Sequence, residues 1–213
     1  MDKFFDLSNP VMRFLTRIVD LAILNILTVV YALPVVTAGA SFTAMNYVLL
    51  HLCRRDETYV AKMFRKSFKD NLRQGIPLGL IAAGAALITA VDLWGMHASE
   101  SKLITVMMIA ITVIAGFLLA AFVYMFALQS RYENTVRGTI VNAFKLAVGN
   151  LPRTALMMVI WIIWALIMVY LHKAAPLAFL LFGYTLPGYL CAMLYDRVFV
   201  KLEEDSSANN ILE

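Results

Sequence analysis

Three polar residues lie within the first long apolar stretch of the chain, and their types are those that support ionic or proton-relay chemistry. Arg17, Asp20 and Asn25 all fall in residues 14–36. A charge in hydrocarbon is unfavourable by ~2.5–3.5 kcal/mol per residue on insertion scales, so each charged group needs a partner or water. One interpretation is a polar site or relay. The other, which we favour, is an Arg17–Asp20 pair one helical turn apart, with the long arginine reaching out to the surface.

Other residue types that carry chemistry are scattered. The two cysteines, Cys53 and Cys191, have no metal-ligand spacing, and His97 and His172 alone are weak evidence for zinc although both are expected at one face. The chain has no phosphate-binding loop, nucleophile elbow, H-E-x-x-H or C-x-x-C motif. We therefore expect no catalytic residue, no cofactor and no metal site, and we do not expect an enzyme or a self-powered pump.

The elements that must hold these residues are apolar helices. The chain is 62% hydrophobic and 15% charged, with a mean hydropathy of +0.77, whereas soluble domains are about half apolar and a quarter charged. A membrane-spanning helix needs roughly 20 mostly apolar residues. We expect an all-α, polytopic membrane protein with about six transmembrane helices in one domain, residues 1–204. The expected spans are residues 14–36, 40–53, 76–95, 103–128, 154–171 and 176–198.

Several expected spans have special features. Pro34 should end or kink the first one, because proline lacks an N–H donor. The stretch 40–53 is short. It is either a full crossing, which we favour, a helix that continues into the cytoplasm, or a re-entrant element, and five or four crossings are the alternatives. Pro187 and Gly188 predict a kink in the last span. The polar residues 205–213 predict a disordered cytoplasmic tail.

The distribution of positive charge orients the chain. Of 18 Lys and Arg residues, 16 fall in alternate hydrophilic segments on one side, and only Lys102 and Lys173 fall on the other. Lys and Arg are retained on the cytoplasmic side during insertion, so both termini are expected in the cytoplasm, at the inner membrane of a bacterium. The net charge of +4 arises in segments that face anionic lipid. We therefore expect membrane lipids, and not nucleic acid, as contacts.

Two further segments, residues 58–73 and 135–149, have the pattern of amphipathic helices. Apolar residues recur every fourth position on one face, and Lys and Arg occupy the opposite face. Such helices lie on a membrane surface or dock on a partner. The residues expected to face the inner leaflet or a partner are Phe64, Phe68 and Phe144.

Small residues recur every fourth position where the third span begins. This spacing lets helix backbones approach closely and predicts a helix-packing seam. The pattern leaves open whether the partner helix is internal or belongs to another protein, and it permits self-association. The seam is Gly75, Gly79 and Ala83, with a second register at Ala82, Ala86 and Ala90.

A series of short motifs runs from about residue 4 to residue 203. They are Pro34-x-x-Thr37-x-Gly39-x-Ser41-x-Thr43-Ala44, Phe64-x-x-x-Phe68-x-x-Asn71, Tyr132 with Asn134, Asn142-Ala143, Asn150 before Pro152, and Phe199. In order and spacing they resemble the YesL-like family of small bacterial membrane proteins. The resemblance implies a bacterial inner-membrane protein, typically encoded near carbohydrate ABC-transporter permeases, solute-binding proteins and sugar-responsive sensor kinases. It implies no catalytic residues.

These observations give three functional hypotheses. The first is an accessory or assembly subunit of an oligosaccharide ABC importer, in contact with its permease subunits. The second is an independent channel or carrier for a small solute, with Asp20 and Asn25 lining the path. The third, a membrane regulator of a sensor kinase, ranks last because the chain has no soluble output domain. The ligand, if any, and the oligomeric state are left open by the sequence.

Overall fold

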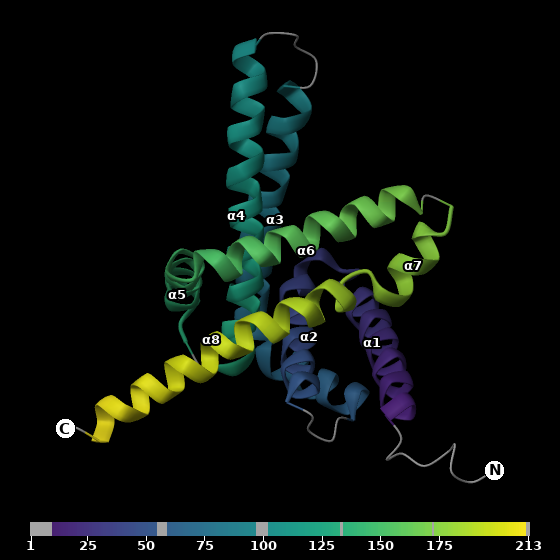
Figure 1. Cartoon of the computed structure of the whole chain (residues 1–213), viewed down its shortest axis with the longest axis vertical. Coiled ribbons are helices and arrows are strands. Elements are labelled where there is room, and N and C mark those ends of the chain that lie inside the picture. Colours follow the sequence, from purple (N-terminus) through teal and green to yellow (C-terminus); the bar gives the residue numbers. More distant parts are fainter. Residues whose placement is uncertain (1–9, 55–58, 97–101, 133, 172, 212–213) are drawn as a thin grey trace.

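The computed structural model describes residues 10–54, 59–96, 102–132, 134–171 and 173–211, and within these ranges every regular element is a helix. In chain order the elements are α1 (Pro10–Ala32), the 3-10 helix η2 (Val35–Thr37), α2 (Ala38–Cys53), α3 (Val60–Met96), α4 (Lys102–Arg131), α5 (Val136–Gly149), α6 (Leu151–Tyr170), α7 (Ala175–Phe182) and α8 (Thr185–Ile211). Figure 1 shows their arrangement.

Most of these helices have the length and composition of membrane spans. Within the described residues, five are long and apolar enough to cross a bilayer, and the bent pair α7–α8 would add a sixth. The short stretch around α2 qualifies as Val35–Cys53 once η2 is included. The chain is an all-α, multi-pass membrane protein, as the sequence predicted.

Proline and threonine mark several helix ends. Helix α1 ends at Ala32, two residues before Pro34, in agreement with the predicted stop. Thr135 caps α5 by accepting a hydrogen bond from the Gly138 N–H at 3.2 Å, which satisfies one of the free donors at a helix start. Pro152 lies in the first turn of α6, where its missing N–H is not needed.

Helix α3 joins two elements that the sequence treated separately. The expected amphipathic helix 58–73 and the expected span 76–95 form one continuous helix of 37 residues, with Pro77 inside it. Both segments share the helical period, and membrane helices tolerate an internal proline when neighbouring groups satisfy the freed backbone. At 1.5 Å per residue α3 is about 55 Å long, so it extends well beyond a hydrocarbon core of about 30 Å.

The last span is broken, but not where the sequence predicted. Helices α7 and α8 meet at an angle of 42° across Gly183 and Tyr184. Pro187 does not kink the chain because it lies in the first turn of α8, where no intrahelical donor is required. Helix α8 also continues to Ile211, through most of the segment 205–213 that was expected to be disordered, while residues 212–213 lie outside the described residues.

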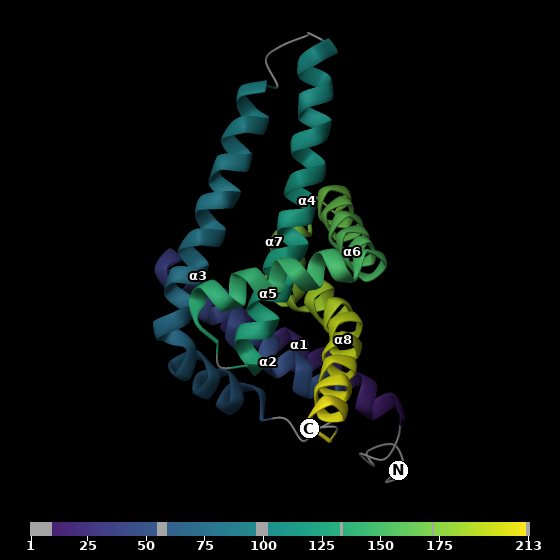
Figure 2. The ribbon, with the colours of Figure 1, turned by 90° about the vertical axis from the view of Figure 1, so that its left-hand side faces the viewer.

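Helix α2 is central to the packed part of the molecule. It contacts α1, α3, α4 and α8, and its side chains Val48, Leu49 and Leu52 are fully buried. The α3–α4 hairpin extends away from this centre, and its outer half stands clear of the other helices in both views (Figures 1 and 2). Helix α5 runs across the direction of the hairpin near its base (Figure 2).

Candidate functional site

The break between α7 and α8 is closed by one side chain from α1. Asn25 is fully buried, and its Nδ2 donates to the carbonyl oxygens of Phe179 and Leu180, both at 2.8 Å. Its Oδ1 accepts from the N–H groups of Tyr184 at 2.8 Å and Thr185 at 3.2 Å. A break in a membrane helix frees backbone groups that lipid cannot satisfy. The Asn25 carboxamide supplies partners for three of them, at Leu180, Tyr184 and Thr185. The Phe179 carbonyl oxygen accepts from Asn25 in addition to its helical bond from the Gly183 N–H at 2.8 Å.

Two further hydrogen bonds complete the closure. The Thr185 hydroxyl donates to the Leu21 carbonyl oxygen at 3.0 Å, and the Trp164 indole N–H donates to the Gly183 carbonyl oxygen at 2.9 Å. The break is therefore held from α1 and from α6. Both polar atoms of the Asn25 side chain are thus engaged in hydrogen bonds to the backbone at the break.

Arg17 and Asp20 do not join Asn25 in a shared site. Both side chains are partly buried in the first half of α1, and within the described residues no ion pair joins them. The two groups are therefore not in direct contact as an ion pair, although the charge of Arg17 still acts on the Asp20 carboxylate. The relay interpretation also lacks its third member, because Asn25 is engaged with the backbone of α7 and α8.

The glycine seam is an internal contact between α2 and α3. A Cβ atom added to Gly79 would lie 2.6 Å from the Gly39 nitrogen, and one added to Gly75 would lie 2.6 Å from the Ala40 Cα. Only hydrogen atoms fit between these backbones, which explains the small residues. Ala83 lies further along α3 and lines an apolar cavity.

The aromatic face that the sequence assigned to lipid or a partner is mostly buried, which corrects that prediction. Phe64 is 0% and Phe68 9% exposed, and both rings contact Tyr31 of α1, at centroid distances of 5.4 and 4.7 Å. Periodicity identifies an apolar face but does not distinguish lipid from another helix of the same chain. Phe144 remains 37% exposed, with its ring 6.3 Å from that of Phe117.

An apolar cavity of about 300 Å³ lies at the base of the α3–α4 hairpin. Its α3 side is made by small residues, among them Ala83 and Ala86. Large apolar side chains such as Phe42 of α2 and Phe122 of α4 form much of the remaining wall. The cavity is thus suited to an apolar group at membrane depth.

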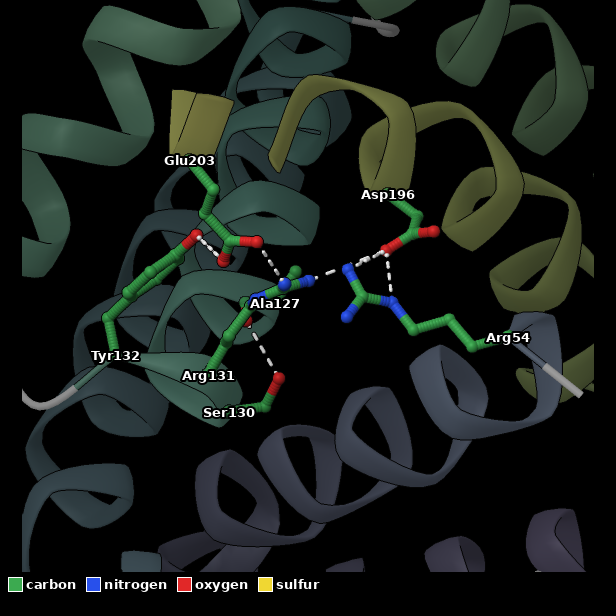
Figure 3. Close-up of polar contacts among 7 residues, drawn as sticks. All are labelled: Arg54, Ala127, Ser130, Arg131, Tyr132, Asp196 and Glu203. Atoms are coloured by element: carbon green, nitrogen blue, oxygen red, sulfur yellow. Dashed lines mark hydrogen bonds and ion pairs between the residues drawn. The ribbon is translucent and has the colours of Figure 1, made fainter. Parts of the chain in front are cut away.

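Charged side chains converge at one end of the helices, which we call the charged end and define by Arg54, Arg131, Asp196 and Glu203 (Figure 3). Asp196 of α8 accepts from Arg54 at the end of α2 at 2.8 Å and from Arg131 of α4 at 3.4 Å. Glu203 accepts from Arg131 at 2.6 Å and from the Tyr132 hydroxyl at 2.9 Å. These bonds tie the C-terminal ends of α2 and α4 to the middle and the C-terminal half of α8.

A polar cavity of about 430 Å³ lies beside this network, between α3 and the end of α4. Carboxamides line its inner part. The Nε2 of buried Gln129 donates to the Gln74 Oε1 at 2.7 Å and to the Asn71 Oδ1 at 3.3 Å. The Gln129 Oε1 in turn accepts from the Thr139 hydroxyl of α5 at 3.2 Å. The amides form one connected network across three helices.

The sequence analysis did not identify this end of the molecule. One available signal was the spacing of Asp196 and Glu203, two carboxylates seven residues apart and hence on one face of the last helix. His97 and His172 lie outside the described residues. Among the residues that are described, no three His, Cys, Asp or Glu side chains are grouped so as to hold a metal ion.

Comparison with known proteins adds one finding. Residues 21–93 match the family model described as DUF624, a protein of unknown function. The matched region runs from the middle of α1 through most of α3, and so includes Asn25 and the Gly39–Gly79 contact. No curated protein and no solved structure matches the chain.

Proposed function

We propose that this protein is a non-enzymatic membrane subunit that docks on the transmembrane helices of a partner through the base of its α3–α4 hairpin. The observation that carries the proposal is the apolar cavity of about 300 Å³, whose α3 side is made of small residues. Helix association in lipid depends on close packing and dispersion, which small residues favour. A large apolar side chain of a partner helix would fill this cavity.

The second small-residue register supports the same face. The first register is used inside the molecule, where Gly79 meets Gly39. In the second register, Ala86 and Ala90 remain exposed along α3. The outer half of the α3–α4 hairpin stands clear of the other helices (Figures 1 and 2). A partner helix could therefore run along this surface.

The family resemblance supports one kind of partner, because YesL-like proteins are typically encoded near carbohydrate ABC-transporter permeases. The YesL-like family falls within DUF624, so the resemblance and the family match agree. We infer a permease subunit of an oligosaccharide ABC importer as the partner. We further place the protein in the inner membrane of a bacterium, with both termini in the cytoplasm, because of the bias in Lys and Arg.

The alternative of an independent channel or carrier has less support. It requires Asn25 to line a solute path, and the Asn25 carboxamide is fully buried and bonded to four backbone groups. A solute passing Asn25 would have to displace those bonds. No feature in the described part of the chain specifically favours the alternative of a sensor-kinase regulator.

Affinity capture from native membranes in mild detergent tests the proposal. We expect the wild-type protein to retain ABC permease subunits. Ala86→Trp places a large ring in the apolar cavity and should abolish that retention. Leu166→Trp, at an exposed position of α6 that does not line the cavity, is the matched control and should leave it unchanged.

Two results would contradict the proposal. One is a wild-type protein that purifies free of other membrane proteins. The other is equal retention by Ala86→Trp and wild type, with both properly folded. Topology is tested separately with a reporter that is active only in the cytoplasm. Fused after Glu204, it should be active.

A further inference from the structure

The polar cavity beside the charged end is not explained by a docking function. Two basic residues of α3, Lys66 and Arg73, line it, and its volume of about 430 Å³ falls in the range of small-molecule sites. Its lining combines carboxamides, hydroxyls and cations. Such a lining recognises a polar ligand, and the orientation of its groups indicates which kind.

The carboxamides of Gln74 and Asn71 direct their oxygen atoms toward Gln129. The Gln74 Oε1 and the Asn71 Oδ1 both accept from the Gln129 Nε2, and the Gln129 Oε1 accepts from Thr139. Reversing the Gln129 amide would place its oxygen against two other oxygens, so the network fixes its orientation. Within the described residues, the Gln74 Nε2 has no partner. The amide layer therefore offers the cavity a hydrogen-bond donor.

The rim adds positive charge. Lys66 and Arg73 line the cavity from exposed positions of α3, and neither forms an ion pair in the part of the chain that the structure describes. Arg131 also lines it, with its charge already balanced by Asp196 and Glu203. One carboxylate, Asp70, also lines the cavity, so its negative charge offsets part of the positive charge of Lys66 and Arg73. Three more basic residues, Lys62, Arg65 and Lys69, lie exposed on the same helix but do not line the cavity.

We propose that this cavity binds a phosphate group. Free donors and cations match phosphate oxygens, and arginine and lysine are the side chains that bind them most often. A second hollow of about 240 Å³, lined by Arg54 and His51, shares Tyr47, Ser130 and Arg131 with the first and leaves room for the rest of the ligand. The phosphate belongs to an anionic lipid headgroup or to a soluble phosphate ester, and the experiment separates the two.

Full-length protein is reconstituted in nanodiscs of phosphatidylcholine alone and of phosphatidylcholine with phosphatidylglycerol in equal parts. Calorimetric titration of the first sample with inorganic phosphate and with glycerol phosphate measures a soluble ligand. Native mass spectrometry of the second counts retained phosphatidylglycerol. Lys66→Gln with Arg73→Gln removes two charge-assisted contacts to the phosphate, so affinity should fall by at least about 10-fold.

Lys69→Gln with Arg65→Gln is the matched control, because it removes the same charge from the same helix outside the cavity. It should retain affinity within a few-fold. Retention of phosphatidylglycerol without response to soluble phosphate assigns a lipid headgroup, and the reverse assigns a soluble ester. Binding of neither, equal losses in the two double variants, or a response to neutral maltose in place of phosphate would overturn the proposal. None of these outcomes depends on the partner named above.

Discussion

The side chain of Asn25 binds the backbone of Thr185, 160 positions later in the chain. Through this contact the first membrane helix completes the last one, since the same carboxamide also accepts from Tyr184 and donates to two carbonyl oxygens of α7. A polar residue in an apolar span is often a functional site. In this molecule Asn25 replaces the hydrogen bonds that a broken helix loses.

Replacing Asn25 with Leu should therefore destabilise the protein strongly. The change keeps a similar volume but removes four hydrogen bonds, and interhelical bonds in membranes contribute ~0.6 kcal/mol on average and up to ~1.7. We expect a loss of about 2–4 kcal/mol in the free energy of unfolding, measured by denaturant titration in detergent. Thr16→Val removes an exposed bond within α1 and should have little effect. Equal stability of the two variants would refute the structural role of Asn25.

The close contact of α2 and α3 gives a second prediction. In Gly39→Ala, the new Cβ would lie 2.6 Å from the Gly79 Cα, so the two helices must separate. We expect thermal stability to fall, with a loss of about 1–3 kcal/mol as in other overpacked sites. The control is Gly84→Ala, where nothing lies within 4 Å of the added atom and helix propensity should raise stability slightly. A tolerated Gly39→Ala would mean that the helices are not this close.

The seam illustrates what the sequence could and could not predict. Small residues every fourth position identified the face of α3, because that spacing follows from helix geometry. Its partner Gly39 was visible only as part of a motif, since no local pattern pairs residues on different helices. The apolar spans were predictable because hydrocarbon demands long apolar helices.

The burial of Phe64 and the break before Thr185 were not predictable in the same way. An apolar face fits lipid and protein equally, so Phe64 was assigned outward although Tyr31 covers it. The chain breaks at Gly183 and Tyr184 because Asn25, from a distant helix, replaces the lost bonds. Pro187 was the stronger local signal, but a proline in the first turn of a helix disturbs nothing.

The charged end gives a third prediction, for Asp196→Asn. Asp196 accepts from both Arg54 and Arg131, and both it and Arg131 are mostly buried. Within the described residues the substitution leaves Glu203 as the one carboxylate paired with Arg131, so we expect a loss of about 1–3 kcal/mol in unfolding free energy. Arg197→Gln changes an exposed charge on the same helix and should be nearly neutral. If both variants unfold alike, the network contributes nothing to stability.

Tyr132 gives a prediction about alkaline pH. Burial, followed by its hydrogen bond to Glu203, raises the pKa of Tyr132 from 10.0 to about 12. A raised pKa stabilises the fold fully below pH 10, and that contribution disappears as pH rises from 10 to about 12, because the unfolded chain loses the proton first. The thermal unfolding temperature of the wild-type protein should fall across this pH window more steeply than that of Tyr132→Phe. If the two curves of unfolding temperature against pH were parallel, the fold would not raise the pKa of Tyr132.

The docking face is tested most directly by photo-crosslinking in living cells. A photoreactive amino acid replaces either Leu87 on the hairpin or Phe14 on α1, two side chains that are each 66% exposed. We predict that Leu87 forms adducts with an ABC permease subunit, identified by mass spectrometry, and that Phe14 forms adducts with lipid alone. Lipid adducts alone from Leu87, or the same protein adducts from both positions, would contradict the account.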